Sequence, residues 1–247
     1  MVRRALIIAA PGPPHTPRFL EGVGKDFINY QRFLRSPTGG AWAAEEIIPV
    51  YNATRAALLK VVRRLQADYT FIVFSGHGGT EAGSGRTFLE INPLGEYVWL
   101  EELITPARQQ LVVLDSCRTL VGGLAGLINE QLRLFPSALT RATARQLFER
   151  HLSRCEPGRI VCFSCENGSA SADTPGGGLF SNTLLDVAQQ WAATPSQFGI
   201  LPVLPALQQS QQVLHRLAQT QQPGIRSSPA VRQHWFPLAL RQAVQVL

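Results

Sequence analysis

The chain has 247 residues, of which 45% are hydrophobic and 16% are charged. This composition excludes an intrinsically disordered chain, and the length allows a core that needs no disulfide or metal for stability. The 23 Lys and Arg residues exceed the 17 Asp and Glu residues, but the basic residues form no long tract and do not interleave with aromatic residues. We therefore interpret the surplus as a solvated surface and expect no nucleic-acid partner. No apolar run approaches the ~18 residues that span a membrane, so we expect no membrane partner.

The first predicted element is a strand over residues 4–9. The apolar stretch around it imitates a secretory signal peptide, but it is shorter than the ~7 to 15 apolar residues of such a peptide, and Pro11 ends it. We therefore expect a cytoplasmic protein whose thiols are reduced. The four cysteines are Cys117, Cys155, Cys162 and Cys165.

Short apolar runs then alternate with longer helical patterns, which predicts an α/β protein with a largely parallel sheet covered on both faces. Further strands are expected at 46–50, 69–75, 110–115 and 159–164, with an edge strand at 234–240. Helical patterns cover 52–66, 179–191 and 208–222, a hairpin joins 87–91 to 97–100, and a Gly-rich loop spans 76–86.

Residues 118–158 depart from this alternation. Arginines dominate the second half of the segment, where only Glu149 and Glu156 oppose them. We interpret the segment as an Arg-rich helical insertion within one domain that comprises residues 1–247.

Two of the predicted strands end in residues that can carry out chemistry. His77 follows the strand at 69–75, and Cys117 follows the strand at 110–115. Ligands of open α/β sheets collect at the carboxyl ends of the strands, so both side chains are expected to face one crevice. A thiol needs a base to become a nucleophilic thiolate, and an imidazole can supply it. The backbone N–H groups of Gly78 and Cys117 are candidate oxyanion donors.

Each motif alone has a simpler interpretation. A His in a Gly-rich turn can be structural, and a Cys at a strand end is often a small apolar residue. The two motifs together, each after an apolar strand, favour catalysis. Cys162 and Cys165 have the CxxC spacing of zinc and redox sites, but no second pair completes four ligands, so we interpret them as core thiols.

With these motifs the chain resembles the caspase-like cysteine peptidases, which include caspases, metacaspases and bacterial relatives. The family's strand followed by Ser-Gly-His-Gly matches residues 69–78, and its strand followed by Asp-x-Cys matches residues 111–117. Supporting similarities span almost the whole chain, at 4–8, 20–26, 164–173, 178–185, 221–223 and 236–240. The resemblance implies the caspase-like (caspase–hemoglobinase) α/β fold, with a mostly parallel central sheet of about six strands and helices on both faces.

The resemblance also implies a cysteine peptidase with His77 as the base and Cys117 as the nucleophile. Caspases that cut after Asp have Gln two residues before the nucleophile, whereas this chain has Asp115. Metacaspases form an acidic pocket for P1, the residue before the cut, at positions that match Asp26, Ser75 and Asp115. Two carboxylates would favour a guanidinium, which predicts cleavage after Arg and, to a smaller extent, Lys.

The sequence departs from the family at a few positions near these residues. Val23 stands where the family has Cys, and Lys25 stands where it has Asn and could pair with Asp26. Arg118 and Thr119 replace the His-Ser of metacaspases, although caspases also carry Arg at the first of these positions. Asp115 could alternatively be a carboxylate that caps a nearby amide.

Relatives of this family are often latent enzymes that are activated by cleavage, by calcium or by a regulatory partner. The Arg-rich insertion lies where caspases are cut between their subunits. It offers the candidate cleavage sites Arg141, Arg145, Arg150 and Arg154. No acidic cluster indicates a calcium site, and we expect no metal and no other cofactor.

The sequence thus predicts a latent Cys-His endopeptidase that acts on proteins or peptides with Arg or Lys at P1. The resemblance to bacterial relatives allows a role in regulated cell death or defence. Two alternatives remain: a catalytically silent caspase-like module that binds proteins, and an Arg-rich nucleic-acid binder. Intact His77 and Cys117 argue against the first, and the missing basic stripe argues against the second.

Overall fold

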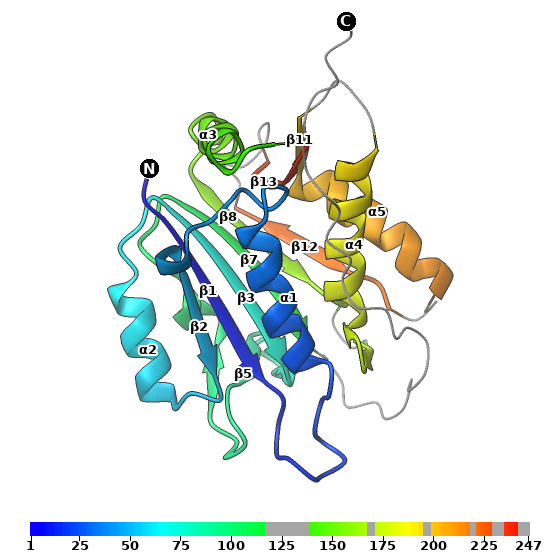
Figure 1. Ribbon diagram of the computed structural model, residues 1–247. Coiled ribbons are helices and arrows are strands. Elements are labelled where there is room, and N and C mark those ends of the chain that lie inside the picture. The colour runs from blue at the N-terminus through cyan, green and yellow to red at the C-terminus, as the bar shows by residue number, and fades with distance from the viewer. Residues whose placement is uncertain (117–138, 167–170, 195–198, 218–220, 229–234, 242–247) are drawn as a thin grey trace, which may run out of the picture.

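A six-stranded sheet forms the centre of the molecule (Figure 1). The computed structural model describes residues 1–116, 139–166, 171–194, 199–217, 221–228 and 235–241. The strand order is β12-β8-β7-β3-β1-β2; all neighbours are parallel except β12, which runs antiparallel to β8. The strands are β1 (Arg3–Ala10), β2 (Ile47–Tyr51), β3 (Tyr69–Gly76), β7 (Gln109–Ser116), β8 (Gly158–Phe163) and β12 (Gly224–Ser227). The predicted mostly parallel sheet of about six strands is confirmed.

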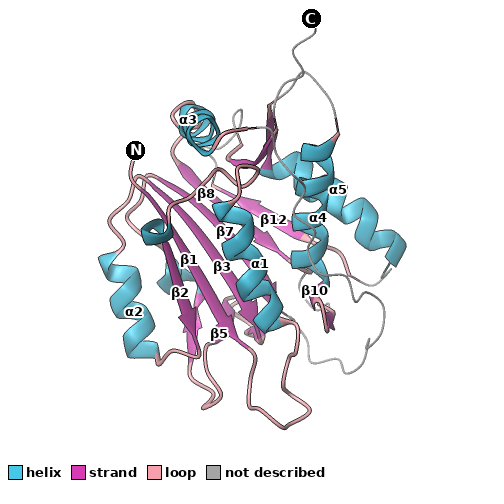
Figure 2. Cartoon of the chain, viewed as in Figure 1, coloured by secondary structure: helices cyan, strands magenta, loops and turns pink. Residues whose placement is uncertain are grey.

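Two apolar layers cover the two faces of this sheet, as Figure 2 shows for the helices. On one face lie α1 (Val23–Arg35), α3 (Arg141–Leu152), α4 (Leu179–Ala193) and α5 (Val203–Leu217). On the other face lie α2 (Arg55–Arg64), the 3-10 helix η2 (Leu100–Leu103) and a three-stranded antiparallel sheet of β4 (Gly78–Thr80), β5 (Thr87–Glu90) and β6 (Tyr97–Trp99). Because helices flank both faces, β3 and β7 are buried at every position, which explains their unbroken apolar sequence.

The remaining elements are short. They are the 3-10 helix η1 (Ala44–Glu46) and the antiparallel pairs β9 (Asp173–Thr174) with β10 (Gly177–Gly178) and β11 (Ile200–Pro202) with β13 (Pro237–Leu240). No helix among the described residues is long and apolar enough to cross a membrane.

The fold differs from the sequence expectations in four places. The predicted Gly-rich loop at 76–86 contains β4, because Gly78 to Thr80 pair with β5. The terminal strand β13 pairs with β11 and packs near α3 and α4, so it is not an edge of the central sheet, whose edge on that side is β12.

Helix α5 begins at Val203, five residues before the prediction. Helix α1 was not predicted from its pattern, in which only Val23, Tyr30, Phe33 and Leu34 supply buried apolar side chains.

Helix α3 lies within the predicted Arg-rich insertion, whose first part, up to residue 138, is outside the described residues. The helix is part of the main core, since Ala144, Phe148 and Leu152 pack against the central sheet. The described part of the segment therefore contributes to the fold of the domain.

An ion-pair network ties this helix to the amino end of β1. The side chain of Arg3 is fully buried, with its guanidinium 4.5 Å from the centre of the Trp42 ring. Glu46 accepts hydrogen bonds from Arg3 at 3.1 Å and from both terminal nitrogens of Arg145 at 2.9 and 2.6 Å. Burial alone would raise the pKa of Glu46, but these bonds and the Ala43 N–H outweigh it and lower the pKa to about 2.

We predict that Glu46→Gln lowers the free energy of unfolding by about 3 kcal/mol, because the buried charge of Arg3 would keep only the more distant Glu149, 3.7 Å from its Nε. In the wild type the depressed pKa contributes stability above pH 4.5 that is lost as the pH falls through about 2. Urea unfolding measured from pH 7 to pH 2 tests both statements. The neighbouring exposed Glu45→Gln is the matched control and should change little; equal effects of the two variants would contradict the network's role.

Candidate active site

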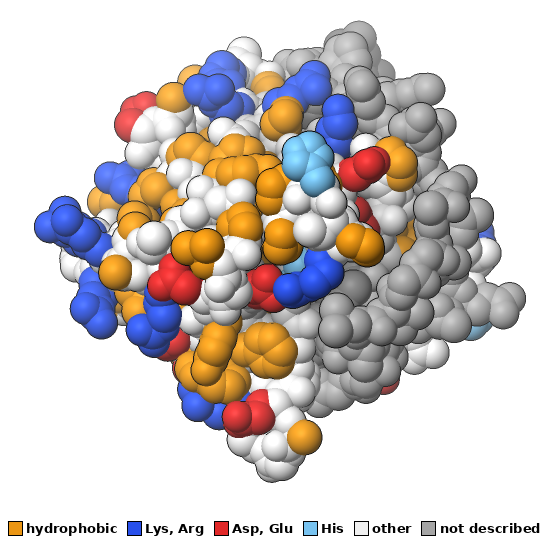
Figure 3. All heavy atoms as spheres, turned by 90° about the horizontal axis from the view of Figure 1, so that it is seen from below, with side chains coloured by type: hydrophobic (Ala, Val, Ile, Leu, Met, Phe, Trp, Pro, Cys, Tyr) orange, Lys and Arg blue, Asp and Glu red, His pale blue; other side chains and the backbone are white. Residues whose placement is uncertain are grey.

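The candidate site lies at the carboxyl end of the central sheet, where β3 and β7 stop side by side. The register pairs Ser75 with Asp115 and Gly76 with Ser116. His77 follows β3 directly. Cys117 follows β7 directly and lies outside the described residues, as does the rest of 117–138. Figure 3 views the molecule from the side on which these strands end.

His77 is held by the loop that joins β1 to α1. Its Nε2 lies 2.5 Å from the carbonyl oxygen of Arg18. Since a carbonyl only accepts, Nε2 carries the hydrogen and donates it, which leaves Nδ1 as the acceptor of the neutral ring. Gly12 packs against the same ring with a φ of +87°, and a Cβ there would lie 3.0 Å from Nε2. The loop therefore defines both the position and the tautomer of the imidazole.

Gly78 is the first residue of β4 and lies beside Ser116, whose Oγ would be 3.0 Å from a Cβ at this position. The N–H of Glu90 donates to the carbonyl oxygen of His77 at 2.9 Å, so Gly78 and Leu89 form a pair that does not exchange ladder hydrogen bonds. The N–H of Gly78 consequently points away from β5 and is not used by the small sheet. This geometry leaves it available to a ligand at the strand ends.

Two buried carboxylates lie next to these strand ends. Asp26, on α1, accepts hydrogen bonds from Ser75 Oγ at 2.6 Å and from the N–H of Gly178 at 3.1 Å. Asp115, on β7, accepts from Ser171 Oγ at 2.8 Å and from the N–H of Ser181 at 2.9 Å. The structure thus brings together the three residues assigned to the P1 pocket: Asp26, Ser75 and Asp115.

The departures from the family pattern do not disturb this arrangement. Lys25 is exposed and forms no ion pair with Asp26, because the two side chains leave α1 on different sides. Val23 is buried and lines the hollow beside the carboxylates.

Burial dominates the electrostatics of the pocket. Burial first, and then the charge of Asp115, raise the pKa of Asp26 well above its ordinary value. Burial also raises the pKa of Asp115, against hydrogen bonds from Ser181, Ser171 and Ser164 that lower it. Burial therefore makes the two negative charges costly, and an entering cation would offset that cost.

Asp173 is a third carboxylate of this hollow and was missed in the sequence. It lies on β9, opposite Gly178 of β10, and accepts a hydrogen bond from the N–H of Gly22 at 3.2 Å. Burial is the main cause that raises its pKa to about 6. Its position within the stretch that resembles the family was the only signal in the sequence, and strand pairing with Gly178 could not be inferred from it.

The hollow itself is small, with room of about 20 Å³, which is close to that of a single water molecule. Its walls come from α1, β3, β7 and the β9–β10 segment. The lining residues are Leu20, Val23, Ser75, Gly76, Asp115, Ser116, Ser171, Ala172, Asp173 and Gly178. A guanidinium would need the walls to separate.

The other cysteines are buried, and none of Cys155, Cys162 and Cys165 forms a disulfide. Burial raises the pKa of Cys155 and of Cys162 to about 12, which makes both thiols unreactive. The described residues contain no group of three or more His, Cys, Asp or Glu side chains that could hold a metal ion. Cys162 and Cys165 therefore lie where core thiols are expected.

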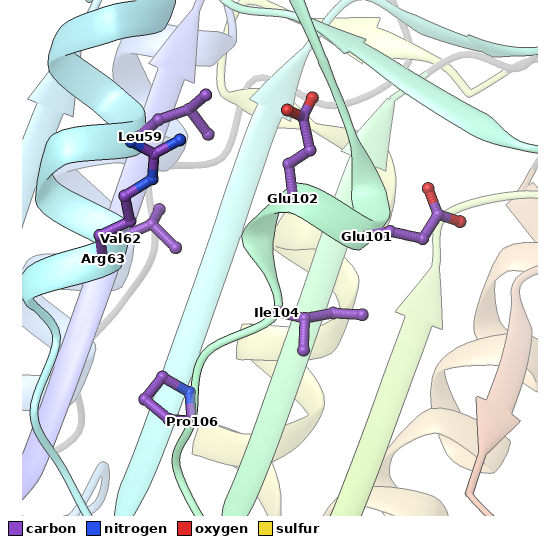
Figure 4. A pocket seen from close by; sticks show the side chains of 7 residues that line it. All are labelled: Leu59, Val62, Arg63, Glu101, Glu102, Ile104 and Pro106. Carbon is purple, nitrogen blue, oxygen red and sulfur yellow. The ribbon is translucent and has the colours of Figure 1, made fainter.

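A larger hollow lies elsewhere, between α2 and η2, with a volume of about 430 Å³ (Figure 4). Its lining includes Val62 near the end of α2 and Pro106 shortly before β7 begins. It is thus nearer the amino ends of the parallel strands, away from His77. No predicted site residue lines it.

The four candidate cleavage sites lie in or after α3. Arg141 donates to the carbonyl oxygen of Trp42 at 3.1 Å, and Arg145 is paired with Glu46. Arg150 is exposed in the last turn of the helix, and Arg154 is exposed in the turn that follows it.

Comparison with known proteins agrees with the fold. The model of the caspase domain family matches residues 2–233. Caspase-1 from Spodoptera frugiperda superposes with a TM-score of 0.56 at 14% identity, over 91% of this chain and 86% of that one. The Drosophila initiator caspase Dronc gives 0.54 at 12% identity, over 91% of this chain and 78% of that one. No curated protein matches the sequence.

These findings define a cysteine protease, a hydrolase of peptide bonds in protein substrates. The chain belongs to the caspase domain family. The structural neighbours establish the fold, and the family match establishes the class of enzyme.

We predict that Gly178→Ala destabilises the protein by about 1 to 3 kcal/mol. The added methyl group would lie 2.2 Å from Oδ2 of Asp115, a carboxylate that Ser171 and Ser181 hold in place. The control is Gly24→Ala in α1, where nothing lies within 4 Å of a Cβ and alanine should be neutral or stabilising. Urea unfolding of both variants decides; a Gly178→Ala protein as stable as the wild type would show that the pocket wall is not packed as described.

Proposed function

We propose that the protein is an endopeptidase in which His77 is the general base and Cys117 is the nucleophile. The register of β3 and β7 supports this most directly, because Gly76 and Ser116 are partners and each precedes one member of the dyad. The hydrogen bond from Nε2 to Arg18 leaves Nδ1 of His77 to receive the thiol proton.

The proposed reaction has two stages, acylation of Cys117 and hydrolysis of the resulting thioester. The thiol proton passes to Nδ1, the sulfur bonds to the scissile carbonyl carbon, and the N–H groups of Gly78 and Cys117 stabilise the oxyanion. The imidazolium then protonates the leaving amine as the C–N bond breaks, which leaves a thioester. Water, deprotonated by His77, attacks that thioester and releases the acid and the thiol.

We further propose that Asp26, Ser75 and Asp115 select Arg, and to a smaller extent Lys, at P1. The closeness of two carboxylates supports this, since a guanidinium offers donors to both and its positive charge offsets their repulsion. Asp173 adds a third carboxylate to the rim of the hollow.

We propose that the enzyme is latent, because the hollow beside the carboxylates is small. Room of about 20 Å³ does not accept an Arg side chain, so an activating event must open the pocket. Either cleavage or a regulatory partner could separate the β9–β10 segment from α1. Of the candidate cleavage sites, Arg154 is the best placed, because it is exposed and lies after Leu152, the last residue of α3. We also propose a cytoplasmic location, as expected from the sequence, and a role in bacterial cell death or defence, which the family resemblance allows.

A silent binding module is the second candidate, because a hollow this small is also what such a module would present. A measurement of peptidase activity distinguishes the endopeptidase from the silent module.

We predict that the activated protein hydrolyses a fluorogenic Arg peptide and that Cys117→Ala and His77→Ala each lose a thousandfold or more of kcat/KM. Cys155→Ala is the matched control, since its thiol is buried in the core away from the strand ends. Activity that survives in Cys117→Ala, or that depends equally on Cys155, would contradict the dyad.

We predict that the same enzyme cleaves after Arg and Lys but not after Asp. Asp115→Asn should lower kcat/KM for the Arg peptide by about tenfold or more, because one of two charged partners is lost. A peptide series that differs only at P1 measures this in both proteins. Cleavage after Asp with none after Arg would overturn the pocket assignment while leaving the dyad standing.

A further inference from the structure

We propose that the ion pair between Arg18 and Glu90 is a positioning device for His77. The proposal rests on the proposed function of His77 as the base. It assigns a role to two side chains that do not touch substrate and that act through the imidazole.

Three contacts close a ring around His77. The imidazole Nε2 donates to the carbonyl oxygen of Arg18 at 2.5 Å. The guanidinium of Arg18 binds Oε2 of Glu90 at 2.6 Å. The N–H of Glu90 in turn donates to the carbonyl oxygen of His77 at 2.9 Å. The same two residues therefore hold both the backbone and the ring of His77.

The Arg18 side chain is the main tether of its loop. Residues 14–19 are exposed, and their other hydrogen bonds are local turns, such as the bond from the N–H of Phe19 to the carbonyl oxygen of Thr16. Among the described residues, the Arg18–Glu90 contact is the one ion pair that joins this stretch to the remainder of the fold. Without it, the carbonyl oxygen of Arg18 would be positioned only by the turn and by the bond from the N–H of Leu20 to the carbonyl oxygen of Pro11 at 2.8 Å.

Glu90 is suited to this role because water solvates its carboxylate only in part. Its side chain is only 14% exposed, and its Oε1 is buried without a hydrogen-bond partner. The Arg18 side chain is 49% exposed, so solvent screens the pair in part, while the low exposure of Glu90 makes the pair stronger than one in which both side chains are exposed. Glu90 is also fixed in β5, opposite Tyr97 of β6, and thus offers a rigid anchor.

The test uses the full chain with Arg18→Ala, Glu90→Gln, the double variant and the charge reversal Arg18→Glu/Glu90→Arg. We expect each single variant to lower kcat about tenfold with KM within about twofold, because the loss is one of geometry at the base. The double variant should be no slower than either single variant, and the charge reversal should recover most of kcat. Glu101→Gln is the control, since it removes the more exposed Arg86–Glu101 pair of the same region.

A second readout does not need activity. The ¹⁵N spectrum of histidine-labelled protein, with His77 assigned by comparison with His77→Ala, should show the neutral Nε2–H form in the wild type and a tautomer mixture in Glu90→Gln. An inactive wild type with this spectral change would refute the proposed function but keep the positioning role. Additive losses in kcat, an effect confined to KM, or an unchanged tautomer would overturn the positioning role.

Discussion

The parallel pairing of β3 with β7 is the constraint on which the site depends. Two strands in register bring Gly76 and Ser116 to the same edge of the sheet, and these residues directly precede His77 and Cys117, which are far apart in sequence. Burial of both strands on both faces enforces that register, because a shift by one residue would turn every apolar side chain to the opposite face. The geometry of a small edge thus follows from the packing of the whole core.

The same edge concentrates groups that are costly to bury. Among the described residues no cation pairs with Asp26 or Asp115, and backbone and hydroxyl donors offset only part of the cost of burial. At the amino end of β1, the cost of burying a charge is offset by an ion pair, since buried Arg3 is paired with Glu46. The ion pair at the amino end of β1 therefore stabilises the fold. The carboxylates at the other end have no cation among the described residues, as is expected of a site that binds one.

Much of this could be predicted from the sequence, and the exceptions have physical causes. Strands such as β3 and β7 were predictable because burial on both faces leaves an unbroken apolar run, and Asp26, Ser75 and Asp115 were assigned together by resemblance. Asp173 and Gly178 escaped prediction because only the pairing of β9 with β10 brings them to the pocket. The role of the Arg18 carbonyl was equally invisible, since a backbone group in an irregular loop leaves no residue-type signal.

We propose that an imidazole-activated thiol faces a pocket for basic side chains at this edge. Labelling with a peptidyl Arg chloromethyl ketone, followed by mass spectrometry of the digest, tests it most directly. The account predicts one thioether per chain, on Cys117, formed much more slowly in His77→Ala and not formed with an otherwise identical Asp reagent. Labelling spread over Cys155, Cys162 and Cys165, or equal reaction with the Asp reagent, would contradict it.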